Sequence, residues 1–341
     1  DKENCLYAPD VISFAREKGY FSGANKDFSF ADAYCPLDFS GLRFCEARVW
    51  SYYNMFSKAT GQAYLSYIQG DSKEPMPLYV KPDQKVSVRD IQRAMRDHYE
   101  GTALDITKDM GAGAFNMPYR LSPLTFKVDG VEYFNERPIS TQQTAFTFVA
   151  QMRANLPDVV GGVLWFGLDD ANMTVFTPVY CNTNQVPDVY AEGNGDCVTF
   201  SWNSAFWIYN WVADMIRPRY SLMVSDMQQV QNELEDLYAN AQEGVEATAM
   251  KLYQQDPLKA RDFLTRYTAM TAKDAVDSWK KLGEFLIVRY NDGAVKRVKN
   301  GRIVPPETGN CAPLDRPGYS QEFLQELIKA TGDRYKMKEL K

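Results

Sequence analysis

The sequence predicts an α+β fold in which a layered αβ part is followed by a helical C-terminal region. Two observations lead to this prediction. A segment with helical spacing at 140–156 precedes two apolar segments, Val160–Gly167 and Thr174–Tyr180, which fit a β-hairpin. In the last third of the chain, apolar side chains recur at helical spacing instead. We therefore expect a sandwich part over residues 1–200 and a helical region over residues 201–341 that packs on it.

The first third is rich in aromatic residues and loops. Val11–Lys18 fits a short helix, whereas Ala47–Phe56 is β-branched and aromatic, as expected of a buried strand or bridging segment. Leu78–Lys81 fits a strand. Ser87 then opens a sequence close to a capping box, and we expect its helix to run to about Tyr99.

The middle third is expected to form the ordered core. Ser140–Leu156 fits a helix that is limited by Pro157. Val160–Gly167 is so apolar that a strand there must be covered on both faces. Asp169–Asn172 fits a turn. Because proline cannot donate to the ladder, Pro178 indicates that the returning strand either bulges or lies near a sheet edge.

The last third fits a series of helices. Asn291-Asp292-Gly293 and Asn300-Gly301 are turn sequences that separate the last helix from the others. A break near Gly244 stays open for the longest of them. The expected helices are Ser204–Ile216, Ser221–Tyr253, Pro257–Met270, Ala272–Tyr290 and Ser320–Thr331.

The bulk composition is that of a folded protein with a large core. The chain has 341 residues, of which 45% are hydrophobic, and a formal net charge of −6. Lysines and arginines are spread among acidic residues, without the clustered basic face that binds nucleic acid. No apolar run approaches the roughly 18–20 residues that span a bilayer. We therefore expect no nucleic-acid partner and no membrane segment.

No standard cofactor motif is present. The chain has neither a P-loop nor a G-x-G-x-x-G after a strand, and Gly111–Ala114 is interpreted as loop material rather than a phosphate cradle. His98 is the only histidine, at the end of a predicted helix, where hydrogen bonding is a more common role than catalysis. Without a C-x-x-C pair or a second histidine, a Cys/His metal site is not expected. The sequence thus predicts no cofactor and no metal.

Asp169 and Asp170 are adjacent carboxylates in the predicted hairpin turn. Neighbouring residues of a strand point to opposite faces, so these two could share a site only through the turn. Aspartate is common in turns because of its local hydrogen bonding, and we favour this interpretation over paired catalysis or cation binding.

Arg137 lies in Asn135–Ser140, just before the predicted middle helix. An arginine that enters an apolar unit must be paired or must face a cleft. Two interpretations stay open. It forms a salt bridge with a nearby acid, or it is a positive group that steers a substrate carboxylate or polarises a nucleophile.

Six cysteines permit three disulfides. The spacings of Cys35 with Cys45 and of Cys181 with Cys197 suit local loops, but six buried free thiols fit the sequence equally well. Disulfides would imply a periplasmic or secreted protein, and a cytoplasmic home stays open. The remaining two cysteines are Cys5 and Cys311.

Five segments in succession carry a family resemblance. They are YAPDVISFAREKGYFSG (Tyr7–Gly23), ARVWSYYNMF (Ala47–Phe56), MRDHYEGTALD (Met95–Asp105), ERPISTQQTAFTFVAQMRANLPD (Glu136–Asp158) and GVLWFGLDDANMTVFTPVY (Gly162–Tyr180). Together they resemble dipeptidase A-type bacterial dipeptidases of the cysteine N-terminal-nucleophile hydrolase superfamily. Their order and spacing fit along most of residues 1–291, and the succession is more specific than any one segment.

This resemblance implies the αββα sandwich of N-terminal-nucleophile hydrolases, related to penicillin V acylase and bile-salt hydrolases. In such enzymes a cysteine becomes residue one, its thiolate attacks the amide carbonyl and its own α-amino group is the base. An oxyanion site stabilises the tetrahedral intermediate. The family's Cys-Thr opening is absent here, and Cys5, in the context Glu3–Tyr7, is not a substitute. We expect the nucleophile upstream of Asp1, and this chain to be a truncation, a proteolytic fragment or one chain of a cleaved enzyme.

The function implied by the resemblance is that of the C-terminal portion of a dipeptidase, inactive without its upstream segment. A dipeptide or small amide and that upstream segment or chain are the expected partners, and a homo-oligomer stays open. Arg137 is carried over, because by its place it resembles the arginine that faces the nucleophile in the penicillin V acylase relatives. The alternative is a non-catalytic binding or scaffold protein on the same fold. A helical interaction module over Ser221–Tyr290 is disfavoured, since core packing explains ordinary amphipathic spacing.

Overall fold

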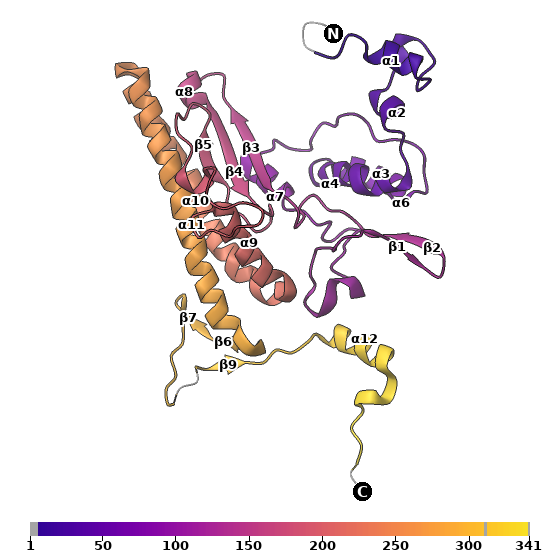
Figure 1. The fold of residues 1–341 in the computed structure, drawn as a ribbon, viewed down its shortest axis with the longest axis vertical. Coiled ribbons are helices and arrows are strands. Elements are labelled where there is room, and N and C mark those ends of the chain that lie inside the picture. Colours follow the sequence, from indigo (N-terminus) through magenta and orange to yellow (C-terminus); the bar gives the residue numbers. More distant parts are fainter. Residues whose placement is uncertain (1–5, 310–311, 340–341) are drawn as a thin grey trace. The chain divides into compact units, whose positions relative to one another are not determined.

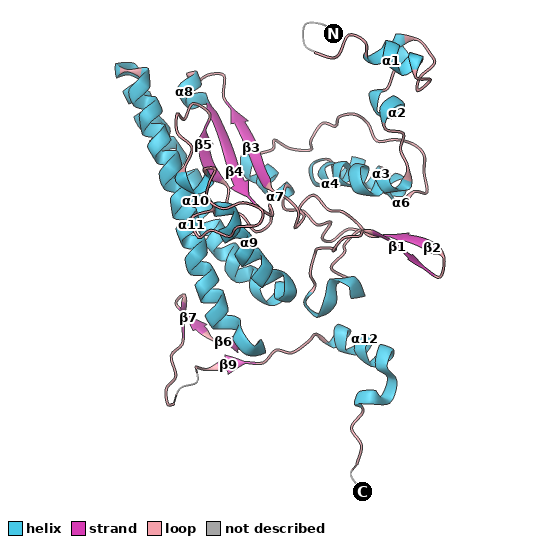
Figure 2. Ribbon diagram, in the orientation of Figure 1, coloured by secondary structure: helices cyan, strands magenta, loops and turns pink. Residues whose placement is uncertain are grey.

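The computed structural model describes residues 6–309 and 312–339, which fall into two compact units. The first unit is formed by the described residues up to Gln84 together with Thr125–Arg137. The second is formed by Lys85–Leu124 and by the described residues from Pro138 onward (Figure 1). Helices and antiparallel strands occur in both units (Figure 2), which confirms the predicted α+β class.

The first unit is built from short helices and one hairpin. Its two strands pair in antiparallel register from Thr125↔Phe134 to Val128↔Val131. The predicted helix at 11–18 is confirmed. The elements are α1 (Val11–Glu17), α2 (Phe30–Tyr34), α3 (Phe39–Gly41), α4 (Ala47–Phe56), α5 (Lys58–Ala63), α6 (Leu65–Gln69), β1 (Thr125–Val128) and β2 (Val131–Phe134).

Two strand predictions in this unit are wrong. Ala47–Phe56 is helix α4, whose buried residues Ala47, Trp50 and Ser51 follow the three- and four-residue spacing of a helix. Burial of Trp50, whose Nε1 donates to a backbone carbonyl at 2.7 Å, outweighs the strand preference of the aromatic residues. Leu78–Lys81 is loop, because its side chains are mostly exposed and a strand there would bury nothing.

The second unit contains a three-stranded antiparallel sheet in the order β3-β4-β5. The predicted hairpin is confirmed as β4 and β5, and of the two alternatives for Pro178 the edge strand is observed. On the outer side of β5, Pro178 has no N–H, and the Tyr180 N–H two residues on donates to Thr268 Oγ1 at 3.3 Å. The strands are β3 (Phe146–Met152), β4 (Gly162–Leu168) and β5 (Thr177–Tyr180).

The helix predicted over 140–156 is wrong, because this segment forms β3. Seven consecutive residues pair with β4, from Phe146↔Leu168 to Met152↔Gly162. Exposed and buried residues alternate along the strand, with Phe148 on one face and Val149 on the other. This period of two outweighs the helical spacing that the same apolar residues also fit. Arg137 therefore precedes a loop and a strand rather than a helix.

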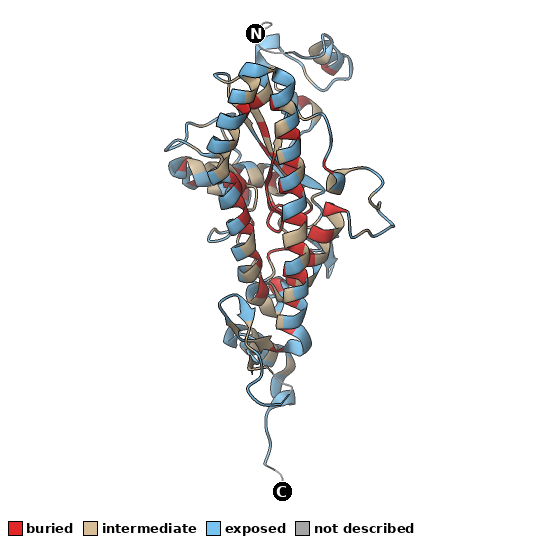
Figure 3. Cartoon of the chain, turned by 90° about the vertical axis from the view of Figure 1, so that its left-hand side faces the viewer, coloured by how far each residue is buried: buried red, intermediate tan, exposed pale blue. Residues whose placement is uncertain are grey.

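Helices pack against one face of this sheet. Figure 3 shows the buried residues of the two longest helices, α10 and α11, as stripes along their length. Within the described residues, no helix is both long and apolar enough to cross a membrane. The helices of the unit are α7 (Val88–Ala94), α8 (Asp158–Gly161), α9 (Ala205–Ile216), α10 (Tyr220–Gln255), α11 (Pro257–Tyr290) and α12 (Gln321–Thr331), and its short strands are β6 (Val295–Lys296), β7 (Val298–Lys299), β8 (Arg302–Ile303) and β9 (Leu314–Asp315).

Two helix boundaries differ from the predictions, and the break that stayed open near Gly244 is not observed. The helices expected at 257–270 and 272–290 are one helix, α11, because neither proline nor glycine interrupts its buried stripe at the supposed break. Gly244 does not break α10, since one glycine costs only about 1 kcal/mol in a helix held by tertiary packing. The capping box of α7 is confirmed at Ser87, but the helix ends at Ala94, well before Tyr99, whose φ of 65° is not helical.

Candidate functional site

The turn that follows β4 carries buried carboxylates. Asp169 and Asp170 are 1% and 0% exposed. Asp169 has a φ of 66°, a left-handed conformation that aspartate tolerates better than most residues. The predicted turn is confirmed, but its side chains lie in the core rather than in water.

Each carboxylate accepts its own hydrogen bonds. Asp170 Oδ1 accepts from Ser140 Oγ at 2.6 Å and from the backbone N–H of Asn172 at 3.0 Å. Asp169 Oδ1 accepts from Asn210 Nδ2 at 3.0 Å. Among the described residues, neither Oδ2 atom has a hydrogen-bond donor. Carboxylates buried in this way depend on a nearby positive charge.

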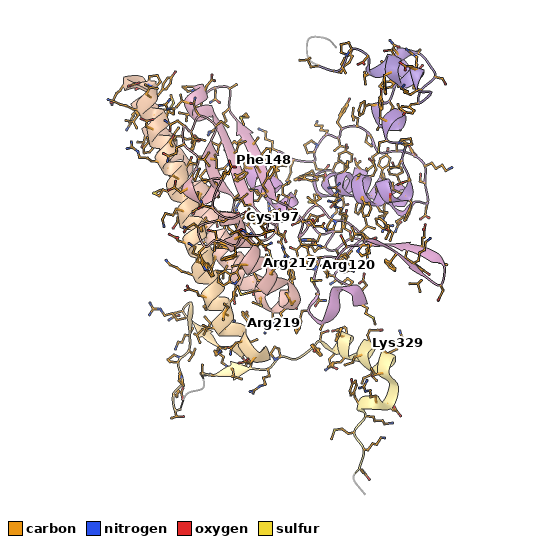
Figure 4. The ribbon with its side chains drawn as sticks, viewed as in Figure 1. Arg120, Phe148, Cys197, Arg217, Arg219 and Lys329 are labelled. Carbon is orange, nitrogen blue, oxygen red and sulfur yellow. The ribbon has the colours of Figure 1, made fainter. Side chains whose placement is uncertain are left out.

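Arg217, the first residue after α9, supplies that charge. Its Nη2 lies 3.8 Å from the Oδ2 atoms of both Asp169 and Asp170, and its Nη1 pairs with Asp214. The guanidinium also lies over the Tyr119 ring, 5.6 Å from its centroid. The Arg217 side chain, labelled in Figure 4, is only 11% exposed. Arg217 is not among the predicted site residues, although an arginine directly after an apolar helix signals a buried partner.

The surroundings of the turn raise the pKa of Asp169. Burial raises the pKa of Asp169 to about 7; the charge of Asp170 acts in the same direction, while the Asn210 hydrogen bond and Arg217 oppose both. Burial and the charge of Asp170 likewise raise the pKa of Tyr119. The cluster can therefore take up or release a proton near neutral pH.

Asn172 connects the turn to two tyrosines and to α10. Its Nδ2 donates to Tyr220 Oη at 2.9 Å and to Tyr119 Oη at 3.2 Å. Its backbone carbonyl accepts from Gln231 Nε2 of α10 at 3.0 Å. The position of the turn is thus fixed by side chains that come from two other segments, the loop around Tyr119 and helix α10, which carries both Tyr220 and Gln231.

Glu235 of α10 is a third buried acid, next to Asp169 and Asp170 of the turn. Its side chain is 1% exposed, pairs with Arg89 and Arg96 and accepts the Phe176 N–H at 2.9 Å. Arg96 in turn donates from Nε to the carbonyl of Ala171 at 3.0 Å. These contacts hold α7, α10 and the hairpin together around one carboxylate.

A polar cleft of about 340 Å³ adjoins the turn. Its lining carries guanidinium, carboxylate, amide and hydroxyl groups, so it can hydrogen-bond to both a positive and a negative group of one ligand. Its volume lies at the lower end of the range for small-molecule sites. The lining residues are Arg93, Arg96, Glu100, Asn172, Tyr220, Gln228, Gln231 and Asn232.

His98 is fully buried and contacts Glu100, one of the residues that line this cleft. Its Nδ1 lies 3.0 Å from Glu100 Oε1, and its ring meets the Tyr119 ring edge-on with 4.8 Å between centroids. Its Nε2 has no hydrogen-bond partner in the described part of the chain, so no Ser-His-Asp arrangement forms there. His98 serves as a hydrogen-bonding residue, as expected, and the partner that the sequence did not reveal is Glu100.

Arg137 lies in the first unit, three residues after β2, and is exposed. The acid next to it, Glu136, pairs with Arg43. The turn cluster and the cleft contain only residues of the second unit. A role for Arg137 toward the nucleophile stays a prediction.

The described cysteines are exposed free thiols. Neither Cys35 with Cys45 nor Cys181 with Cys197 forms a disulfide, so of the two alternatives the free thiols are observed, although at the surface rather than buried. Cys5 and Cys311 lie outside the described residues, and an exported location stays a prediction. Over residues 6–309 and 312–339, no group of three His, Cys, Asp or Glu side chains is placed to hold a metal ion.

Comparison with known proteins gives a consistent set of relatives. The profile of peptidase family C69 matches residues 1–233. A probable dipeptidase of Salmonella dublin is 26% identical over 180 residues, which are 53% of this chain and 36% of that protein. A probable dipeptidase of Latilactobacillus sakei is 25% identical over 45% of this chain and 28% of its own length. Dipeptidase A of Lactobacillus helveticus is 22% identical over 70% of this chain and 42% of its own length. The chain therefore spans less than half the length of these relatives.

Proposed function

Because this chain belongs to peptidase family C69, we propose that it is the C-terminal portion of a dipeptidase whose nucleophile is an N-terminal cysteine on an upstream segment. The family match over residues 1–233 carries this proposal, and it includes the turn cluster and the cleft. In the proposed reaction the thiolate attacks the peptide carbonyl, and the amine of the second residue leaves with a proton. Water then hydrolyses the thioester and restores the thiol.

The exposed face of the β3-β4-β5 sheet supports a sandwich with a second layer. Phe146, Phe148 and Met152 project from β3 and are 56%, 47% and 62% exposed, whereas the other face is covered by helices. Covering an apolar side chain of this size contributes about 1.5–3 kcal/mol. We propose that upstream strands cover this face to complete an αββα sandwich, with residues 1–200 as part of it and 201–341 as the helical body.

The proposed role of Arg137 can be tested in the assembled enzyme. Arg137→Ala should lower kcat about 100-fold or more, because a positive group toward the nucleophile acts on the transition state. The free energy of unfolding should change little, since Arg137 is exposed. Arg302→Ala, at an exposed position on β8, is the control. Equal turnover of the two variants would retire the role of Arg137.

N-terminal sequencing and intact-mass measurement of the protein from its native source test the larger proposal. A copurifying segment that begins with cysteine is expected, and alkylation of that cysteine should abolish hydrolysis of dipeptides. A protein that carries no such segment and hydrolyses no dipeptide would instead fit the alternative, a non-catalytic binding protein on the same fold.

A further inference from the structure

The turn between α7 and Gly101 is held in a strained conformation. Tyr99 is fully buried and has a φ of 65°, a region that bulky side chains rarely adopt. Thr102 fixes it by donating to the Tyr99 carbonyl from its backbone N–H at 3.1 Å and from its Oγ1 at 2.7 Å. Strain of this kind persists only where the surrounding structure enforces it, and it is concentrated at functional sites.

The consequence of this turn is that Glu100 folds back onto His98. Glu100 Oε2 accepts the backbone N–H of His98 at 2.7 Å, and Oε1 lies 3.0 Å from His98 Nδ1. Both carboxylate oxygens are fixed in direction, yet the side chain is 48% exposed and lines the polar cleft. The carboxylate is therefore preoriented for a donor that enters from the cleft.

Glu100 also keeps its negative charge. Burial disfavours its ionised form, but the hydrogen bond and the charge of His98 outweigh this effect and hold the pKa of Glu100 below its usual value. Among the described residues, His98 is the one group at ion-pair distance from Glu100, and no lysine or arginine lies that close. The cleft thus offers a small ligand a carboxylate that is held in a fixed direction.

The two arginines of the cleft differ in how firmly they are held. Arg96 is committed to buried Glu235 and to the carbonyl of Ala171. Arg93 is 73% exposed and pairs with Asp90 one turn away on α7. Because the Arg93 side chain stays accessible to solvent, its guanidinium can also contact an incoming carboxylate.

We propose that this cleft binds a free dipeptide, with the N-terminal ammonium on Glu100 and the C-terminal carboxylate directed to Arg93. The inference rests on the proposed dipeptidase function and deepens it. A fixed carboxylate selects peptides with a free N-terminal ammonium. It rejects peptides that are extended or blocked at this end, because the Glu100 carboxylate would then have no ammonium to pair with. Glu100 is then a residue that determines specificity.

Calorimetric titration of the whole chain with the dipeptide Ala-Ala tests the site. N-acetyl-Ala-Ala lacks the ammonium and Ala-Ala amide lacks the carboxylate. Each should bind about tenfold more weakly or worse, the effect of losing one charge-assisted hydrogen bond. Glu100→Gln keeps the shape of the side chain and should weaken Ala-Ala by the same factor while leaving N-acetyl-Ala-Ala unchanged. Glu243→Gln, an exposed substitution on α10, is the matched control and should bind as the unmodified chain does.

Equal affinity for Ala-Ala and N-acetyl-Ala-Ala, or no binding of Ala-Ala, would overturn the inference, and this comparison requires no variant to fold. In the assembled enzyme, Glu100→Gln should raise KM for Ala-Ala more than it lowers kcat. Hydrolysis with an unchanged KM would remove the site but leave the dipeptidase proposal intact. Binding through Glu100 without any hydrolysis would support the site and count against the dipeptidase.

Discussion

Asp169→Asn should remove a pH-dependent contribution to the stability of the second unit. The pKa of Asp169 rises from 3.8 to about 7 on folding, chiefly through burial. A folded pKa above the unfolded one means that the group favours the folded state at low pH and loses this contribution as pH rises through the folded pKa. Three pKa units correspond to about 4 kcal/mol, lost between about pH 4 and pH 7.

Asparagine is a suitable replacement because it accepts the same Asn210 hydrogen bond and tolerates the φ of 66°. It does not titrate. The free energy of unfolding of the unmodified chain, minus that of the variant, should therefore be about 4 kcal/mol larger at pH 4 than at pH 8. The facing groups Asp170, Asp214 and Arg217 are present in both proteins, so their own effects largely cancel in this difference.

Urea denaturation at several pH values, followed by tryptophan fluorescence, measures this difference. Five of the six tryptophans belong to the second unit, so the signal reports mainly on the unit that contains Asp169. Asp188→Asn, an exposed aspartate of the same unit, is the control. A difference between the unmodified chain and Asp169→Asn that stays flat from pH 4 to pH 8 would refute the assignment of a buried, protonated Asp169.

Three other substitutions test the packing. Glu235→Gln should lower the free energy of unfolding by about 3 kcal/mol, because it leaves Arg96 buried without its charge partner. Urea denaturation measures this free energy, and an unchanged value would contradict the buried network. Gly283→Ala should destabilise by about 2 kcal/mol despite the better helix propensity of alanine, because a Cβ there would meet the Trp211 ring at 2.2 Å; an unchanged melting temperature would argue against this close approach. Phe148→Ser should leave the fold of the chain intact but weaken its association with the proposed upstream segment. Gel filtration of the chain mixed with that segment measures the association. Unchanged association would contradict a second layer on this face.

The sequence predicts those elements of the fold whose structure is determined by one local sequence pattern. The β4-β5 hairpin follows from two apolar runs around a turn, and the α7 start follows from its capping box. The sequence of β3 does not distinguish a strand from a helix, because its apolar residues fit both a period of two and helical spacing; the seven residue pairs with β4 show that it is a strand. In α4, burial of Trp50 decides against the strand preference of its neighbours.

The candidate site was predictable only in part, because its partners come from distant segments. The Asp169–Asn172 turn is visible in the sequence, but its burial depends on Arg217, which follows 45 residues later. The sequence identifies His98 as a candidate because it is the only histidine. The role of Glu100 depends instead on the positive φ of Tyr99, which the neighbouring residues do not predict. Contacts between side chains of distant segments produce no regular spacing in the sequence, so the sequence alone does not predict them.

The two edges of the β3-β4-β5 sheet are chemically unequal. On β5, Pro178 offers no donor, and the next outward N–H, that of Tyr180, is already taken by Thr268. A strand from another molecule therefore finds no template on that side. β3 is the edge at which the sheet can grow, and its side chains are also the exposed ones. Growth in one direction limits runaway edge-to-edge aggregation, while leaving a single site at which further strands can add.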